Sequence, residues 1–369
     1  MKTVIKKLYN AFLRLVEIFS RLLPLKDSVL FFSIRAEGHL LENSKCVYDA
    51  LDEKKDVFAH CMPLSAKLRP VAINKLLTHK VIVTDDFLPL LRDIKLRPEQ
   101  KVFQIWHAGG AFKKMGFDAP SSLNPLYGMN DTVHSQYDDV TVTAEGCREA
   151  FSTAFNLPLS KIHAYGLPRT DKLLNPNVLK NMRDGVLQRN PYLKNKKIYL
   201  YCPTFREDGA KRVFFDPKID FEKLNNELSD DEVFIIRRHP TVKYTFFDRQ
   251  YDRIIDLTGS ESTLDLMSVA SLLVTDYSSC IIEGSVLRLP MLFYCPDIKT
   301  YERGFYLSYP DDLPGEMITD PEKLLSHIRS AVSDRRTDKE EKFRRLQTAA
   351  CDGNSTERIV NIIKSWLHG

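Results

Sequence analysis

Residues 271–295, SLLVTDYSSCIIEGSVLRLPMLFYC, decide the fold. Leu272–Thr275 and Met291–Tyr294 are short apolar runs typical of strands buried on both faces. Ser279–Leu287 between them is expected to be a helix. A strand, a helix and a second strand in this order predict two parallel strands joined by a crossover helix.

The same alternation of apolar runs and helical segments continues on both sides of this stretch. In the second half we expect strands at Ile198–Cys202, Val233–Arg237 and Ile254–Leu257, and helices at Phe221–Leu228, Thr263–Val269, Pro321–Val332 and Ser355–His368. In the first half we expect strands at Val29–Ile34, Val81–Thr84, Val102–Trp106 and Val140–Thr143, and helices at Asn43–Leu51 and Glu145–Phe155. Two such sets predict an α/β protein with two doubly wound domains, joined by a hinge in the polar stretch Asn175–Lys197.

Positive charge is concentrated at the N-terminus. The chain of 369 residues has a formal charge of +4, and residues 1–26 hold six basic residues against one acidic residue. Residues 3–23 show the apolar spacing of an amphipathic helix, which fits either a contact with an anionic membrane surface or packing on the domain. No transmembrane helix or signal peptide is predicted.

Seven cysteines without a CxxC pattern favour a reducing compartment over a disulfide framework or a zinc site.

Four polar loops follow predicted strands, which is where ligands bind in open α/β sheets. The first, WHAGGAFKK (106–114), carries His107, and a histidine is suited to accept a proton from an attacking hydroxyl. The loop also supplies glycines that allow a close approach of the backbone to a ligand and lysines that suit an anion: Gly109, Gly110, Lys113 and Lys114. If this loop is considered by itself, a structural histidine beside a tight turn explains it equally well.

The other three loops, YCPTFR (201–206), RRHP (237–240) and TDYSS (275–279), offer groups that suit a diphosphate. These groups are Thr204, Arg206, Arg238, His239, Ser278 and Ser279. Glu283, one turn further on, is placed to accept hydrogen bonds from a ribose. Each loop also has a plain structural explanation: a strand ended by proline, a solvated basic turn, and a serine helix cap. The P-loop, GxGxxG, GxSxG and D-x-D patterns are absent from the sequence, so we expect lysine, arginine and helix ends, rather than a metal, to hold the phosphates.

Seven motifs in this order resemble the CDP-glycerol glycerophosphotransferase family, which includes teichoic acid primases and polymerases. They are WHAGGAFKKMGF (106–117), YGLPRTD (165–171), YCPTFR (201–206), RRHP (237–240), TDYSS (275–279), YERGFY (301–306) and LPGE (313–316). The resemblance implies a GT-B architecture, in which two Rossmann-like domains face a central cleft. It places a membrane-contact helix at 1–26, an acceptor-side domain at 27–174, a CDP-donor-binding domain at 175–345 and a helix that crosses back to the first domain at 346–369.

The resemblance also implies roles for the residues of these motifs. His107 is expected to be the general base, and His239 is expected to act at the donor phosphates. Donor or phosphate binding is expected of Thr204, Arg206, Arg238, Ser278 and Ser279, with Glu283 at the ribose by analogy with GT-B enzymes. Acceptor or phosphate contacts are expected of Gly109, Gly110, Lys113, Lys114 and Arg169. The loop 117–136 is expected to help select the acceptor.

The implied reaction transfers glycerol phosphate from CDP-glycerol to an undecaprenyl-diphosphate-linked saccharide, with release of CMP, in wall teichoic acid or a related polymer. The expected setting is the cytoplasmic face of a bacterial membrane, without a metal, a cofactor or nucleic acid. The loop around His107 and the chain length favour a primase. A polymerase or ribitol-phosphate transferase of the same family, a GT-B transferase or epimerase using a UDP-sugar, and a binding module with an inactive cleft stay open as alternatives.

Overall fold

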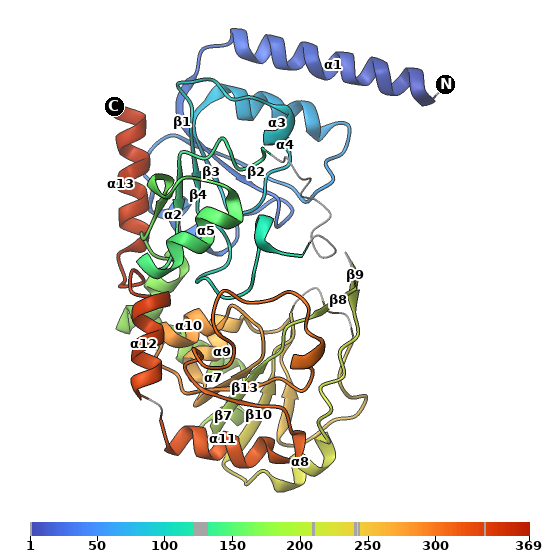
Figure 1. Cartoon of the computed structure of the whole chain (residues 1–369), viewed down its shortest axis with the longest axis vertical. Coiled ribbons are helices and arrows are strands. Elements are labelled where there is room, and N and C mark those ends of the chain that lie inside the picture. The colour runs from blue at the N-terminus through green and yellow to red at the C-terminus, as the bar shows by residue number, and fades with distance from the viewer. Residues whose placement is uncertain (1, 121–131, 209–210, 240–241, 243, 336) are drawn as a thin grey trace.

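The computed structural model describes residues 2–120, 132–208, 211–239, 242, 244–335 and 337–369. Residues 121–131 of the predicted acceptor loop and Pro240 of the RRHP motif therefore lie outside the described residues. Two parallel six-stranded sheets, one above the other in Figure 1, organise the rest of the chain. The prediction of an α/β fold with two parallel sheets is confirmed.

The first sheet has the strand order β2-β1-β3-β4-β5-β6. Its strands are β1 Lys26–Ser33, β2 Lys55–Ala59, β3 His79–Thr84, β4 Lys101–Gln104, β5 Asp139–Thr141 and β6 Ile162–His163. Successive residues of β1 point to opposite faces, since Leu30 and Phe32 join one apolar cluster while Val29 and Phe31 join another. Such a strand is buried on both faces, as expected in a parallel sheet covered by helices on each side.

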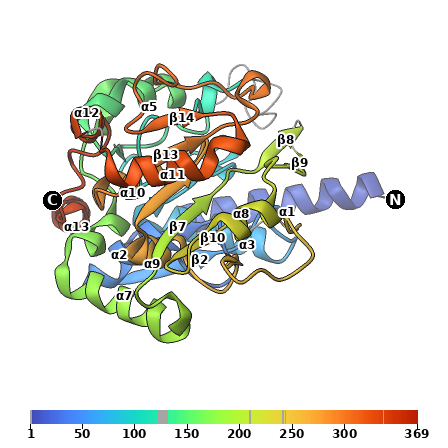
Figure 2. The same cartoon turned by 90° about the horizontal axis from the view of Figure 1, so that it is seen from below.

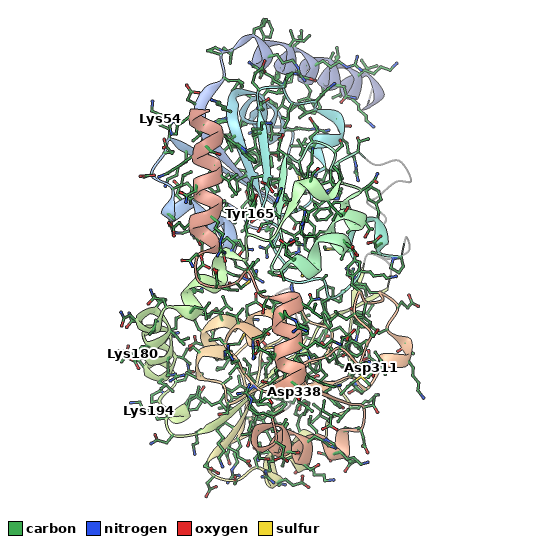
Figure 3. All side chains as sticks on the ribbon, turned by 60° about the vertical axis from the view of Figure 1, so that its left-hand side comes forward. Lys54, Tyr165, Lys180, Lys194, Asp311 and Asp338 are labelled. Atoms are coloured by element: carbon green, nitrogen blue, oxygen red, sulfur yellow. The ribbon has the colours of Figure 1, made fainter. Side chains whose placement is uncertain are left out.

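Helices cover both faces of the first sheet. On one face lie α1 Lys2–Leu22, α3 Leu68–Thr78, α4 Leu90–Asp93 and α5 Arg148–Phe155. On the other face lie α2 Glu42–Ala50 and α13 Ser355–His368, which comes from the far end of the chain. Figure 3 shows α13 running along this half, past Tyr165 towards Lys54. Among the sequence predictions, the helix at Ser355–His368 is confirmed.

The second sheet repeats the plan with the order β11-β10-β7-β12-β13-β14. Its strands are β7 Lys197–Cys202, β10 Glu232–Ile236, β11 Ile254–Asp256, β12 Leu272–Thr275, β13 Met291–Tyr294 and β14 Glu316–Ile318. One face packs on α7 Pro176–Arg189, α9 Thr263–Val269, α10 Ile281–Val286 and α12 Thr337–Gln347, and the other packs on α8 Phe221–Glu227 and α11 Leu324–Ser333. A short antiparallel pair, β8 Arg206–Asp208 and β9 Lys211–Val213, projects from this half.

The polar stretch predicted as a hinge is instead largely helical. Residues 176–189 form α7, which follows the short helix α6 Asp171–Leu174. The side-chain oxygen of Asn175 accepts hydrogen bonds from the backbone N–H groups of Asn177 and Val178, and Pro176 occupies the first turn. The asparagine cap and the proline mark the start of the helix, and its apolar side packs on the second half, where Val186 is buried and Met182 and Leu187 are partly buried.

Helix α1 lies across the end of the first half, away from the second half (Figure 1), and its N-terminus projects beyond the rest of the molecule in Figure 2. Leu13 and Ser20 are buried against the domain. The Tyr9 hydroxyl donates to the carbonyl of Ala66, and the Asn74 amide donates to the Ser20 hydroxyl. Eight large apolar residues of the helix remain exposed: Val4, Ile5, Leu8, Phe12, Leu15, Ile18, Phe19 and Leu22. In the part of the chain that the structure describes, no helix has both the length and the apolar character needed to cross a membrane.

Candidate active site

A cavity of about 570 Å³ lies between the two halves. It is lined by segments that directly follow β3 and β4 of the first sheet and β7, β10 and β12 of the second. These are the carboxyl ends of parallel strands, where ligands bind in open α/β sheets. The lining includes ten of the predicted site residues: His107, Gly109, Gly110, Lys113, Lys114, Thr204, Arg238, His239, Ser278 and Ser279.

His107 enters the cavity from the loop after β4, with about a third of its side chain exposed. Its Nδ1 lies 3.2 Å from the carbonyl oxygen of Asp85 and 3.5 Å from Oδ2 of Asp86. A carbonyl oxygen only accepts hydrogen bonds, so this contact places the proton on Nδ1 and leaves Nε2 as the acceptor. The imidazole is thus held in the tautomer that a general base requires.

The acidic pair Asp85-Asp86 was not predicted as part of the site. Asp85 is fully buried, and its Oδ2 accepts hydrogen bonds from the hydroxyls of Ser33 and Ser44 at 3.2 and 2.8 Å. Burial raises the pKa of the Asp85 carboxyl. Asp86 lines the cavity beside His107. The sequence did hold a signal for this pair, because both residues directly follow the apolar strand β3 at the same sheet edge.

Gly109 and Gly110 allow the two halves to pack closely. A Cβ atom on Gly109 would lie 2.8 Å from Cγ2 of Ile282, and one on Gly110 would also collide with the Ile282 side chain. Gly110 has a φ of 71°, a conformation that favours glycine. Its N–H donates to the Thr143 hydroxyl at 2.9 Å, so this amide is already bonded within the protein. The glycines line the cavity as predicted, but their close approach is to a helix of the second half.

Lys113, Lys114 and Arg303 form a cationic side of the cavity. The backbone of Lys113 pairs with Phe305, and the N–H of Lys114 donates to the carbonyl of Gly304 at 3.1 Å, so the two segments lie side by side. Burial, with the neighbouring Arg303 charge, lowers the pKa of Lys113 to about 8. Arg303 was not predicted, although it belongs to the YERGFY motif.

The second half supplies hydroxyl, imidazole and guanidinium groups. The Thr204 N–H donates to Oδ1 of Asp276 at 2.8 Å, while its buried hydroxyl oxygen has no hydrogen-bond partner among the described residues. The Ser278 hydroxyl oxygen lies 3.4 Å from the N–H of Cys280, the residue before α10. The Arg238 guanidinium forms an ion pair with Asp256 at 2.8 Å, and the ring of His239 lies 5.1 Å from that of Phe205. These groups present donors and positive charge to one wall of the cavity.

Three predicted site residues lie outside the cavity lining. Arg206 pairs with Asp297 at 2.5 Å and with Asp276 at 2.9 Å, and its guanidinium stacks 3.8 Å from the centre of the Phe215 ring. Arg169 and Glu283 are buried and bond to each other at 2.5 Å. These three charges are paired within the protein, and none of the three side chains lines the cavity. Contact of Arg206 with a phosphate, of Arg169 with an acceptor and of Glu283 with a ribose stays a prediction. Among the described residues, no group of three or more His, Cys, Asp and Glu side chains could hold a metal. Metal-independent binding stays a prediction.

The sequence model of the CDP-glycerol:poly(glycerophosphate) glycerophosphotransferase family matches residues 15–365. The chain is 33% identical to the teichoic acid ribitol-phosphate primase of Bacillus spizizenii, covering 100% of this chain and 99% of the relative. It is 29% identical to the teichoic acid glycerol-phosphate primase of Bacillus subtilis, covering 80% of this chain and 76% of the relative.

Solved structures show the same fold. The wall teichoic acid polymerase TagF superposes with a TM-score of 0.77 at 21% identity, covering 100% of this chain and 96% of that chain. The UDP-GlcNAc 2-epimerase from Neisseria meningitidis superposes with a TM-score of 0.60 at 14% identity, covering 92% of this chain and 99% of that one. The fold is thus shared with enzymes whose names describe different reactions.

Proposed function

Because the chain belongs to the CDP-glycerol:poly(glycerophosphate) glycerophosphotransferase family, we propose that it transfers a polyol phosphate from a CDP-polyol to a lipid-linked saccharide in teichoic acid synthesis. The observation that carries this proposal is the cavity itself. It places the His107 imidazole from one half opposite the hydroxyls, imidazole and cations of the other. The shape of the two halves also supports describing the architecture as GT-B.

In the proposed reaction, a hydroxyl of the acceptor attacks the phosphorus that carries the polyol. Nε2 of His107 takes the hydroxyl proton as the new P–O bond forms. The bond between this phosphorus and the bridging oxygen breaks, and CMP leaves with the charge that develops on its phosphate. His239, Ser278, Ser279 and Thr204 stabilise that charge, which is the main task in phosphoryl transfer.

We propose a primase that adds one unit, and we leave glycerol and ribitol as two candidate donors. The motifs resemble a family named for CDP-glycerol, which supports glycerol phosphate. The 33% identity to a ribitol-phosphate primase over the whole chain supports ribitol phosphate. Identity to the poly(ribitol-phosphate) polymerase of the same organism is 28%, which supports a primase over a polymerase.

We further propose that α1 holds the enzyme on the cytoplasmic face of an anionic membrane. One side of the helix packs on the domain, and the adjacent side exposes the eight apolar residues named above. Lys7 and Arg14 are exposed next to this apolar face and Arg21 is partly exposed there, as expected for a helix that lies in a bilayer interface. A lipid-linked acceptor gives such a contact a function, since it brings the cavity to its substrate.

The first experiment measures CMP release from CDP-glycerol and from CDP-ribitol, with a lipid-linked disaccharide as acceptor and with the product sized by mass spectrometry. Addition of one unit from either donor supports the primase, and a ladder of products makes the enzyme a polymerase. Release of UDP from a UDP-sugar, without CMP from either donor, would overturn the proposal, and so would the absence of turnover with any donor.

The assignment of His107 is tested in the same assay. His107→Ala is expected to lower kcat by about 10²–10⁴-fold, the usual contribution of a general base. His39→Ala is the matched control, because His39 is exposed in a loop of the same half and does not line the cavity. Full activity of His107→Ala would refute the assignment without excluding the transfer reaction.

A further inference from the structure

The backbone that carries His107 is held in an unfavourable conformation. Trp106, the residue before it, has a φ of 43°, which places a bulky side chain in the left-handed region. Glu42, at the start of α2, has a φ of 40°. Conformations of this kind persist only where surrounding contacts enforce them, and they cluster at functional sites. The Trp106 N–H donates to the Gln104 side-chain oxygen at 2.9 Å, and the other contacts that hold this turn lead to Arg169.

Arg169 and Asn43 together fix two successive carbonyl groups of the His107 loop. The Asn43 amide nitrogen donates to the carbonyl of Trp106 at 2.9 Å, while its Oδ1 accepts from the backbone N–H of Arg169 at 3.1 Å. The Arg169 guanidinium donates through Nη1 to the carbonyl of His107 at 2.7 Å. The same Nη1 donates to the Glu42 carboxylate at 2.6 Å. All five residues belong to the first half, so this network helps to determine where the His107 backbone lies in that half.

The remaining nitrogens of Arg169 reach the second half. Its Nε donates to Oε1 of Glu283 at 2.7 Å, and its Nη2 lies 2.5 Å from the same oxygen. Arg169 and Glu283 are 7% and 2% exposed, so this ion pair is shielded from solvent and salt. Glu283 belongs to α10, the helix that follows Ser278 and Ser279. Its neighbour Ile282 packs against Gly109 and Gly110 in the His107 loop.

We propose that Arg169 is a positioning residue, which holds the His107 loop in its left-handed turn and fixes it to the donor-side helix α10 through Glu283. This inference rests on the proposed function, in which His107 removes the proton of the acceptor. A guanidinium is suited to the role because its planar fork donates in several fixed directions at once, whereas a lysine ammonium would not reach the same set of acceptors. Displacing a reacting group by about 1 Å can cost about a hundredfold in rate.

The test is a double-mutant cycle between Arg169 and His107, with CMP release as the readout. Arg169→Met is expected to lower kcat by about 10- to 100-fold, while the KM for the CDP-polyol and the affinity for CMP stay within about twofold. Arg169→Lys should recover only part of the loss. In the His107→Ala background, Arg169→Met should cause no further loss of kcat, because a residue that acts through His107 has nothing left to position.

Folding is controlled by two paired variants. Arg169→Met alone leaves the buried Glu283 carboxylate without its cation, so Arg169→Met/Glu283→Gln is measured beside it. Arg329→Met/Glu232→Gln is the matched control, since it removes another ion pair with a buried glutamate at the opposite end of β10 from the cavity. This control should keep the wild-type kcat.

Two results would overturn the inference. One is an unchanged kcat in folded Arg169 variants, and the other is a decrease in kcat by the same factor whether His107 is present or replaced by alanine. A fully active His107→Ala would instead refute the base assignment on which the inference depends.

Discussion

At the residue scale, position 110 shows how tightly the His107 loop is packed against the second half. Gly110→Ala should destabilise the protein by about 2–5 kcal/mol, from about 1–2 kcal/mol for the left-handed backbone and about 1–3 kcal/mol for overpacking against Ile282. Gly38→Ala is the matched control, because Gly38 has a φ of 76° but nothing within 4 Å of its added Cβ. Gly38→Ala should therefore cost only about 1–2 kcal/mol, which comes from the left-handed backbone. Denaturant unfolding measures the free energy of unfolding of both variants, and an equal decrease in the two would contradict the packing argument.

If Ile282 is the obstacle, shortening it should help. In the Gly110→Ala background, Ile282→Val should recover part of the lost stability, although Ile→Val alone usually costs about 0.5–1.5 kcal/mol. Two changes that are each destabilising but partly compensate when combined would locate the collision at this pair.

Lys113 gives the site a pH dependence of known sign. Its pKa in the folded protein is lowered from 10.5 to about 8, mainly by burial. Between pH 8 and pH 10.5 the unfolded chain binds more protons than the folded protein does. Lys113 therefore destabilises the folded protein most below pH 8, and this destabilisation disappears as the pH rises towards 10.5. Lys113→Met should therefore raise the Tm at pH 7, and the gain should shrink as the pH approaches 10.5. Thermal unfolding across this range checks the sign, and a gain that grows with pH would contradict it.

The same titration should affect substrate binding. Loss of the Lys113 charge above pH 8 removes a cation from the cavity, so the KM for the anionic CDP-polyol should rise with pH in the wild type. In Lys113→Met the KM should already be high at pH 7, and this rise should be absent. A rise of the same size in both proteins would assign the pH dependence to another group.

At the scale of elements, the apolar strands and the last helix could be predicted because their own residues determine them. Leu272–Thr275 and Met291–Tyr294 are strands with the predicted bounds, since an uninterrupted apolar run has no stable place outside a buried sheet. Helix α7 was missed because its stretch is polar overall, although its start is marked by Asn175 with Pro176 and its apolar residues Met182, Val186 and Leu187 pack on the second half. Strand β6 has only two residues and takes its structure from pairing with β5, so its own sequence carries little information.

Helix α1 is the element whose proposed role can be tested by itself. Burying a phenylalanine in an apolar phase is worth about 1.5–3 kcal/mol. Phe12→Ala/Phe19→Ala should therefore reduce binding to vesicles that contain phosphatidylglycerol by about a hundredfold or more. Phe214→Ala is the control, because Phe214 is equally exposed but lies in the second half. Vesicle sedimentation measures the partition, and unchanged binding of the double variant would reject the membrane contact through α1.

At the scale of the whole molecule, the rule that ligands bind at the carboxyl ends of parallel strands located the cavity from the sequence. It brought His107, His239 and Ser278 to one place although they come from different halves. The rule could not tell which charged residues face the cavity and which face each other. Arg206 follows a strand as predicted, yet its partner Asp297 is 91 residues away, and the partner of Glu283 is 114 residues away. The first pair joins two distant segments of the second half, and the second pair joins the two halves. Both arise only when the chain folds, so local sequence does not reveal them.

The relative placement of the two halves depends further on the chain crossing back at its end. Helix α12 lies beside the second half, with Asp338 near its start in Figure 3, and its last residue, Gln347, reaches the His107 loop. The Gln347 side-chain oxygen accepts from the N–H of Ala111 at 2.8 Å in a buried contact. Since Ala111 belongs to the same loop as His107, α12 connects the second half to the proposed base.

Gln347→Leu should leave the Ala111 N–H buried without an acceptor, at a cost of about 1–3 kcal/mol in the free energy of unfolding. It should also lower kcat, because the loop that carries His107 loses one of its supports in the second half. Arg345→Leu is the control, since Arg345 is exposed on the same helix and should leave both quantities near wild type. Denaturant unfolding and CMP release measure the two effects. If Gln347→Leu lost stability but kept full kcat, the contact would hold the halves together without influencing the base. The position of His107 would then depend on the other contacts of its loop, among them those of Arg169, Asn43, Gln104 and Thr143.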